Sequence, residues 1–442
     1  MPAPLRYAKQ IPDVVKIWES EGYFLTQVKI WEAQSEARHE LYGKPTAKQL
    51  KQIKTSLKLT KSDIENLQEA KGHETNKLLR IIQSRLSSEV GNFIHLGNTG
   101  SDVLDTSLSL QIIESLNIIR NDFEQLGKSL GKLALKHRNT LQIGRTHGQH
   151  AIPQTFGRQV IGWYAEIKRD IERVDRAKKT ISFGKLSGEI GTHIHIEPEL
   201  EKLALEKLGL KPDEAPTQII GRDRHIEVVG LMVIISGTLS RIAENIRHLA
   251  MTEVGEVREP FYGSSHPGSS AMPHKRNPEL SERIIGLDRA IRSEFMGESE
   301  ASRTLLERDL SHSSTERYVF PDIFENLTYT VRLTKFIIDN LEVFPDKMIK
   351  NLDTTHEAIY SSRLMNALIE TKKKSRLQAY ELVRKLVQQT IDQQKNLSII
   401  ALETKQITDI LNKKDVEKIF DPNFYLKNIE VAFKRTELIS SK

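Results

Sequence analysis

The sequence predicts an all-α protein built around a bundle of long helices. Three segments carry apolar residues at helical spacing, and one of them is apolar around most of its circumference. Strands that alternate apolar and polar residues between hairpin turns, or that alternate with helices as in a parallel sheet, are not evident. We therefore expect helices to pack against helices.

The clearest helical pattern runs from Leu104 to Leu133, where apolar residues recur every three or four positions. This spacing predicts a helix of about eight turns, whereas an ordinary globular helix has about three. Such a stripe needs partner helices along its whole length. The pattern therefore indicates a bundle.

Two further helical patterns support the bundle. Between Val160 and Ala177, charged residues separate the apolar positions, which predicts an amphipathic helix with one solvated face. The segment from about Arg224 to Thr252 opens with the dense apolar run Val228 to Ile235. Because such a helix belongs in the middle of a large assembly, we expect oligomerisation to extend the bundle.

The character of the chain changes near residues 98 and 355. The expected helices before residue 98 are shorter and more polar, and after about residue 355 the chain is strongly charged. We predict three domains, comprising residues 1–98, a central long-helix bundle of residues 99–355, and residues 356–442.

Composition narrows the functional classes. The net charge is +6, and charges of both signs are interleaved along nearly the whole chain. The basic runs are short and lack interleaved aromatics, which favours a solvated surface over nucleic-acid binding but suits anionic small substrates. The absence of cysteine excludes disulfides, thiolate nucleophiles and thiolate metal sites. The first residues lack the apolar segment of a signal peptide, and Val228 to Ile235 is shorter than the roughly 20 residues of a membrane span. We expect a cytoplasmic protein without membrane contact.

Residues 259–278 are too rich in Gly, Ser and Pro for a helix interior, so they form a loop. Composition alone would equally fit a polar connector. A phosphate-binding loop is excluded, because Ser269 and Ser270 follow Gly268 where Lys and Ser or Thr are required.

The order of residues in this loop is more informative. From Gly268 to Pro278 the chain reads Gly-Ser-Ser-Ala-Met-Pro-His-Lys-Arg-Asn-Pro. This resembles the signature loop of the aspartase/fumarase superfamily, and the His-Lys-Arg version resembles its adenylosuccinate lyase family. Other segments resemble that family in the expected order, and they are Leu5–Tyr7 with Ile17–Trp18, Gly144–Ala151, Gln218 with Arg222–His225, and Glu307–Arg317.

The resemblance implies a three-domain fold whose central helices form a 20-helix core in a homotetramer with active sites shared between subunits. It also implies β-elimination of fumarate from adenylosuccinate, giving AMP, and from succinylaminoimidazole carboxamide ribotide, giving the carboxamide ribotide. Neither a cofactor nor a metal is expected.

That elimination requires a base, a cationic cradle and an acid. By resemblance, Ser269 is the base and His147 the general acid, while Lys275 stabilises the dianionic aci-carboxylate. The family also implies that His73 orients the acid and that Glu282 partners the active-site histidine. Taken singly, such residues are more often structural, so the inference depends on the set.

The same resemblance implies a nucleotide site that includes arginines, whose guanidinium groups suit phosphate. The expected substrate-binding residues are Arg6, Tyr7, His73, Glu74, Thr99, Gly100, Thr146, Gln218, Asn277, Arg308, Ser313 and Arg317. Two segments depart from the family pattern. Gly72-His73-Glu74 stands where the family usually has Arg-His-Asp, and Asn98-Thr99-Gly100 stands where it has Leu-Thr-Ser. Thr99 retains a hydroxyl for a substrate carboxylate, but Gly100 cannot provide one.

Three alternatives remain at this point. Another lyase of the superfamily, acting on argininosuccinate, fumarate, aspartate or a carboxymuconate, would share much of the loop. A metal site could use His147 with His150, or His193 and His195 near Glu197, but no third ligand stands at a diagnostic spacing. A helical scaffold would leave the signature loop unexplained.

Overall fold

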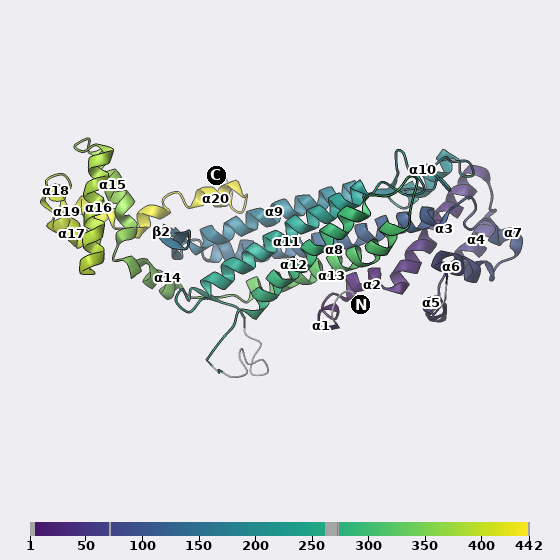
Figure 1. Ribbon diagram of the computed structural model, residues 1–442, viewed down its shortest axis with the longest axis horizontal. Helices are drawn as coiled ribbons and strands as arrows, with labels where there is room; N and C mark the ends of the chain where they lie inside the picture. Colours follow the sequence, from purple (N-terminus) through teal and green to yellow (C-terminus); the bar gives the residue numbers. More distant parts are fainter. Residues whose placement is uncertain (1–4, 70–71, 261–271, 273, 441–442) are drawn as a thin grey trace. The chain divides into compact units, whose positions relative to one another are not determined.

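The computed structural model describes residues 5–69, 72–260, 272 and 274–440 of the 442-residue chain. Helices make up most of the regular structure in this part, which confirms the predicted all-α class (Figure 1). The chain divides into two compact units. Unit 1 comprises Met1–Glu124, Arg169–Ser240 and Ile284–Leu333, and unit 2 comprises Gln125–Lys168, Arg241–Arg283 and Thr334–Lys442.

These units cut through the long helices instead of following the chain. The division into residues 1–98, 99–355 and 356–442 therefore stays a prediction. The long helices themselves match the sequence patterns, because the first two predicted segments fall in α8 (Gly100–Lys136) and α9 (Phe156–Ile181), and the third corresponds to α11 (Asp223–Leu249), which ends three residues earlier than predicted. Two more long helices are α12 (Glu279–Ala301) and α13 (Ser311–Asp339).

Unit 1 joins parts of these long helices to the helices of the N-terminal segment and to α10 (Figure 1). These additional helices are α1 (Leu5–Ala8), α2 (Pro12–Trp18), α3 (Ser20–Tyr42), α4 (Ala47–Ser56), α5 (Lys61–Gln68), α6 (Glu74–Gln83), α7 (Ser88–Gly91) and α10 (Pro198–Lys207). A short parallel pair joins β3 (Phe183–Gly184) to β4 (Lys211–Pro212). Capping boxes at Thr46 and Thr60 start α4 and α5, since each hydroxyl accepts a backbone N–H that the helix leaves without a partner.

The apolar stripe of α8 is buried as its spacing requires. Within unit 1, Ile112, Leu116, Ile119 and Phe123 are fully buried. The start of the same helix is different, because Ser101, Asp102, Asp105, Thr106, Ser107, Ser109 and Gln111 are polar and buried. A buried polar segment needs partners, and its partners form the site described below.

Unit 2 contains an antiparallel hairpin of β1 (Leu141–Thr146) and β2 (Gln149–Thr155), which the sequence reading did not predict. A second pair joins β5 (Val257–Arg258) to β6 (Glu342–Val343). The C-terminal elements are α14 (Pro345–Leu352), η2 (Asp353–Thr355), η3 (Ala358–Tyr360), α15 (Ser361–Glu370), α16 (Arg376–Gln393), α17 (Leu397–Glu403), α18 (Lys405–Thr408), α19 (Lys413–Ile419), η4 (Pro422–Leu426) and α20 (Glu430–Arg435).

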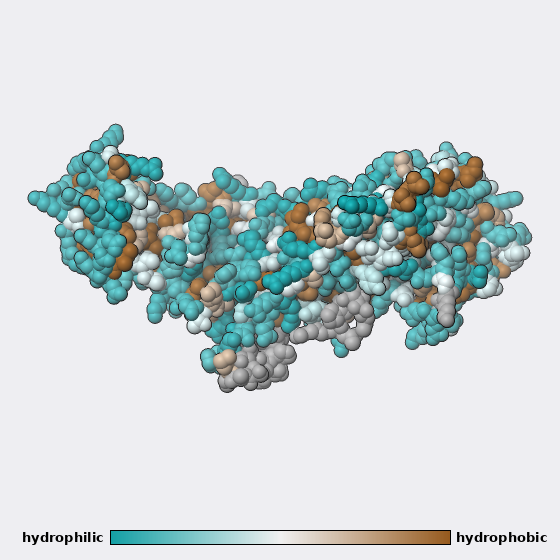
Figure 2. Space-filling view, in the orientation of Figure 1, coloured by the Kyte–Doolittle hydropathy of each residue, from teal (hydrophilic) through white to brown (hydrophobic). Residues whose placement is uncertain are grey.

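Among the described residues, α11 is the one helix long and apolar enough, by length and composition, to cross a membrane. Half of its most apolar stretch is buried within the protein. It also packs on α12 through Ser236, whose hydroxyl lies 2.8 Å from the Asp288 carboxylate. Partial burial and a buried side-chain hydrogen bond are features of a helix that packs within a protein. The face of the protein in Figure 2 is largely hydrophilic, with apolar side chains in small scattered groups.

Candidate active site

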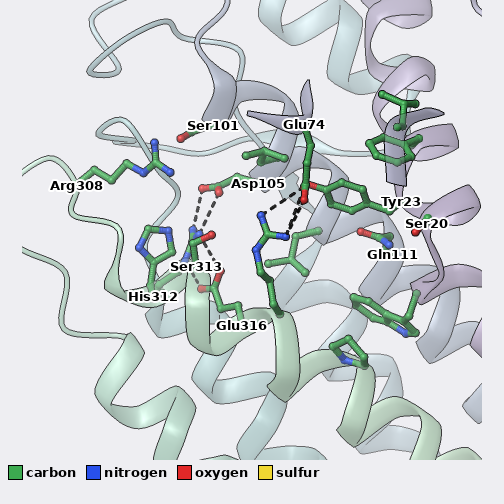
Figure 3. A pocket seen from close by; sticks show the side chains of 18 of the residues that line it. Ser20, Tyr23, Glu74, Ser101, Asp105, Gln111, Arg308, His312, Ser313 and Glu316 are labelled. Carbon is green, nitrogen blue, oxygen red and sulfur yellow. Dashed lines mark hydrogen bonds and ion pairs between the residues drawn. The ribbon is translucent and has the colours of Figure 1, made fainter. Parts of the chain in front are cut away.

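A pocket of about 390 Å³ lies within unit 1 (Figure 3). It is lined by side chains from α2, α3, α5, α6, α8 and α13 and from the segments that precede α11 and α13. The charged and polar residues around it are Ser20, Tyr23, Gln68, Glu74, Ser101, Asp105, Gln111, Arg222, Arg308, His312, Ser313, Glu316 and Arg317. A pocket with this lining suits a polar, charged ligand.

Arg222 forms the buried base of the pocket. Its Nη1 donates to Asp105 Oδ2 at 2.8 Å, its Nη2 to Asp105 Oδ1 at 3.0 Å, and its Nε to Glu316 Oε1 at 2.6 Å. Burial opposes ionisation of Asp105, but the Arg222 guanidinium outweighs burial and lowers the pKa of Asp105 to about 2. Burial raises the pKa of Glu316 despite Arg222. Because its donors are already engaged by carboxylates, Arg222 is a structural cation and not a free anion site.

Two histidines near this base are held neutral. Burial lowers the pKa of His312 to about 4, and the positive charge of Arg222 adds to the effect. His225 is fully buried against Phe320, at 5.8 Å between ring centroids, and burial lowers its pKa to about 3. His312 therefore faces the pocket as an uncharged imidazole at neutral pH.

The structure brings several predicted ligands together at this pocket. Glu74, Arg308, Ser313 and Arg317 all line it. Gln218 belongs to the same cluster of residues, because its Oε1 accepts a hydrogen bond from Arg308 Nη1 at 3.2 Å. In Figure 3, Arg308, His312 and Ser313 lie on one side and Tyr23 on the opposite side. The nucleotide residues expected from three distant segments thus meet in one place.

Other predicted residues of unit 1 occupy defined positions, some near the start of α8 and one in α1. His73 is the N-cap residue of α6, and its ring lies against Gly100, the first residue of α8. The backbone N–H of Thr99 donates to Asp102 Oδ2 at 2.7 Å. Tyr7 in α1 stacks on Tyr329, with ring centroids 4.4 Å apart.

His147 stands at the tip of the hairpin in unit 2. Thr146 ends β1, and His147 and Gly148 form the turn with φ of 54° and 75°. Two consecutive left-handed residues produce the tight turn that suits the twist of paired strands. Arg145 fixes the hairpin to the buried Glu256, with Nη2 and Oε1 2.6 Å apart. An exposed imidazole is therefore held on a rigid support.

The described part of the signature loop also belongs to unit 2. Lys275 is exposed, and its backbone N–H donates to Met272 O at 3.0 Å. Asn277 lines a second pocket of about 730 Å³, and Glu282 is exposed in the first turn of α12. Ser269 and the side chain of Arg6 lie outside the described residues.

Glu259 stands at the start of this loop and forms hydrogen bonds to residues that follow the end of the loop. Its carboxylate accepts from the backbone N–H of Leu280 at 3.0 Å and of Ser281 at 2.7 Å. These are donors that the first turn of α12 leaves without helical partners. The loop therefore ends at a helix start that Glu259 fixes.

The sequence reading missed several residues at the unit 1 pocket, including Tyr23, Asp105, His312 and Glu316. It also missed His95, whose Nδ1 accepts from Trp31 Nε1 at 3.1 Å and whose pKa burial lowers to about 4, with a smaller effect from His73. The sequence contained one signal of this pocket. Several polar residues between positions 101 and 111 stand in a predicted long helix, and the structure shows that they are buried.

The metal alternative can be examined at the histidines that raised it. His193 Nε2 lies 2.8 Å from Glu201 Oε2. The other carboxylate oxygen of Glu201, Oε1, accepts a hydrogen bond from the backbone N–H of Leu186. Over residues 5–69, 72–260, 272 and 274–440, no group of three or more His, Cys, Asp or Glu side chains is arranged to hold a metal ion.

Comparison with known proteins gives the class of the fold and then the family. A family model described as "Lyase" matches residues 6–292, and one described as "Adenylosuccinate lyase C-terminus" matches residues 357–436. A solved fumarate lyase from Mesorhizobium sp. BNC1 superposes with a TM-score of 0.86 at 24% identity, covering 96% of this chain and 97% of that one. The lyase family model, which covers more than half of the chain, places the chain among the lyases, and the superposition shows that it shares their helical fold.

Full-length relatives narrow this class. The chain is 36% identical to the adenylosuccinate lyase of Thermotoga maritima over 95% of this chain and 97% of the relative. It is 39% identical to the adenylosuccinate lyase of Aquifex aeolicus over 89% of this chain and 90% of the relative. The chain belongs to the adenylosuccinate lyase family.

Proposed function

We propose that the chain cleaves adenylosuccinate into AMP and fumarate, and succinylaminoimidazole carboxamide ribotide into the carboxamide ribotide and fumarate. The observation that carries the proposal is the identity of 36% and 39% with two enzymes named adenylosuccinate lyase, over nearly the whole length of each. The unit 1 pocket adds support, because Arg308, Ser313 and Arg317 suit a nucleotide phosphate.

The proposed nucleotide site is the unit 1 pocket. Arg308 and Arg317 would bind the phosphate through their guanidinium groups, and Ser313 would add a neutral donor. Gln218, which already contacts Arg308, would bind the nucleotide next to it. Arg6 and Tyr7 complete the proposed nucleotide ligands.

The elimination itself needs a base, a cation and an acid close to the succinyl group of the substrate. Ser269 would take the proton from the carbon beside the carboxylate, and Lys275 would stabilise the negative charge that develops there, with Asn277 as a neutral donor. His147 would protonate the departing nitrogen. A charged imidazole can give up this proton and remain stable as the neutral form near physiological pH.

The remaining predicted residues would position substrate and acid. His73 would orient the acid and contact substrate, with Glu74 beside it, and Glu282 would partner the active-site histidine. Thr99 and Thr146 offer hydroxyl groups to a substrate carboxylate, whereas Gly100 can offer only its backbone.

We also propose a homotetramer with shared active sites. A groove in unit 1, on α11 and α12, is lined by Ile226, Leu231, Val233, Ile234 and Phe295, and Ile234 is 50% exposed. Apolar side chains gathered in this way favour burial against a second copy. Size-exclusion chromatography with light scattering tests the stoichiometry, and a monomer at micromolar concentration would refute it. We further propose a cytoplasmic location, because the proposed substrates are soluble nucleotides.

Fumarate release tests the activity directly. Purified protein incubated with adenylosuccinate should release fumarate and AMP in equal amounts, and the same assay should detect cleavage of the ribotide. Ser269→Ala should abolish this activity while the oligomer keeps its size. Parallel incubation with argininosuccinate, aspartate and a carboxymuconate separates the rival lyases, because turnover of one of these alone would replace the proposal.

A further inference from the structure

The three arginines at the unit 1 pocket differ in how far carboxylates already neutralise them. Arg222 is 1% exposed and makes bonds of 2.6 to 3.0 Å to Asp105 and Glu316. Two carboxylates surround one guanidinium there, so the cluster is formally negative. A phosphate could not displace them without leaving buried charges unpaired. Arg222 is therefore unavailable to a ligand.

Arg308 is at the other extreme. Its Nη1 donates to the neutral amide of Gln218 at 3.2 Å. Among the residues that the structure describes, no carboxylate oxygen lies within 4.0 Å of its guanidinium. Its charge is therefore available to an anion in the pocket.

Arg317 is intermediate, because Glu74 holds it loosely. Nη1 of Arg317 lies 3.4 and 3.5 Å from the two oxygens of Glu74, and Nη2 lies 3.5 Å from Oε2. Charge-assisted bonds of good geometry are about 2.7 to 2.9 Å. The side chains are 56% and 37% exposed, so water screens the pair further. Such a contact can be exchanged for another anion.

Tyr23 lines the same pocket as Glu74 and Arg317. Burial raises the pKa of Tyr23 above its usual value, and Glu74 raises it further, so the hydroxyl remains a donor at neutral pH. The neutral hydroxyl is a donor that the Glu74 carboxylate could use when Arg317 turns to another anion.

We propose that Glu74 is a phosphate surrogate: it occupies Arg317 in the free enzyme and must yield it to the 5′-phosphate of the substrate, while Arg308 makes the first contact. The inference rests on the proposed function, since it takes that substrate's phosphate as the ligand. Glu74 thus sets affinity for the phosphate group without contacting the reacting bond. A ligand without phosphate cannot displace it and gains nothing from Arg317.

Calorimetric titration of the full-length protein with AMP, and with adenosine as the phosphate-free control, tests this. Glu74→Gln keeps the shape of the side chain but removes its charge, and should tighten AMP binding at least about threefold while adenosine binding stays the same. Glu74→Asp should give a smaller gain, because it shortens the reach to Arg317 by one methylene group. Weaker AMP binding in Glu74→Gln, or an equal change for adenosine, would overturn the inference.

Glu74 could weaken phosphate binding either by competing for Arg317 or simply by repelling the negative charge of the phosphate. An Arg317→Met background distinguishes these two effects. If Glu74 acts by occupying Arg317, Glu74→Gln should bring no gain once Arg317 is gone. A gain of the same size or larger would show that the carboxylate merely repels phosphate, and the inference would be wrong. Its failure differs from failure of the proposed function, which would appear as a wild-type protein that releases no fumarate.

Discussion

The imidazole of His73 lies against the α-carbon of Gly100, in space that any other residue would fill. A β-carbon at position 100 would stand 3.2 Å from Cε1 and 3.3 Å from Nε2 of the ring. These separations are tighter than ordinary van der Waals contact. This chain has glycine at position 100, where the family has serine, and the His73 ring occupies the space that a serine side chain would need.

Gly100→Ser, which restores the family residue, should impair this enzyme. The new side chain would push the His73 ring away, and displacement of a positioning group by a fraction of an ångström should lower kcat/KM by roughly tenfold. Steady-state fumarate release measures the change, and the His73 ring signals in NMR should shift. Gly162→Ser is the matched control, because a β-carbon at Gly162 meets nothing within 4 Å. Unchanged kinetics in Gly100→Ser would show that the ring relaxes freely.

The long helices could be predicted because apolar spacing encodes them directly. Leu104 to Leu133 could only be a long helix, and it lies in α8. The hairpin below His147 escaped prediction because its turn is His147-Gly148 and not a stronger turn pair, and because Pro153 interrupts its second strand. The strands are also short, and the bonds from Gln142 and Arg145 to the buried Glu256 leave no periodic signal in the sequence.

The site could be predicted only as far as the family pattern extends. Arg308, Ser313 and Arg317 were named from one segment and do line one pocket. Asp105 and Glu316 were missed, because their role is to neutralise Arg222, and pairing between side chains more than 90 residues apart depends on tertiary structure. The loose contact between Glu74 and Arg317 could not be inferred from spacing either.

Removal of Arg222 should be strongly destabilising. Arg222→Met would leave the carboxylates of Asp105 and Glu316 buried without their cation, which costs about 3–5 kcal/mol in comparable cases. Urea denaturation followed by circular dichroism measures the free energy of unfolding. Arg303→Met serves as control, because Arg303 is 75% exposed and lies 3.4 Å from the exposed Glu300, so its loss should cost at most about 1 kcal/mol. Similar losses in the two variants would mean that the buried cluster does not depend on its cation.

Glu298 should make stability depend on pH. Burial raises the pKa of Glu298 to about 8, with Glu316 adding to the effect, from an ordinary value of 4.5. The folded state therefore holds a proton that the unfolded state has released between these values. Over that range, stability should fall as pH rises, by up to about 1.4 kcal/mol per pH unit.

Glu298→Gln removes this titration. The variant should lose less thermal stability than the wild type between pH 6 and pH 8.5, and should melt at a higher temperature at the upper pH. Differential scanning calorimetry at several pH values provides the comparison. Glu300→Gln is the control, since Glu300 is exposed and its substitution should leave the pH dependence as it is. Parallel pH curves for wild type and Glu298→Gln would contradict a raised pKa.

Mixing of inactive variants tests whether subunits share the site. If His147 and Ser269 come from different subunits, then tetramers reassembled from equal amounts of His147→Gln and Ser269→Ala should regain about a quarter of wild-type activity, because random mixing leaves about one site in four with both native residues. The control mixes Ser269→Ala with Lys275→Met. Both residues stand in one loop of one chain, so no site can recover both, and activity should stay absent. Recovery in the control, or its absence in verified mixed tetramers of the first pair, would refute the assignment of these residues to separate subunits.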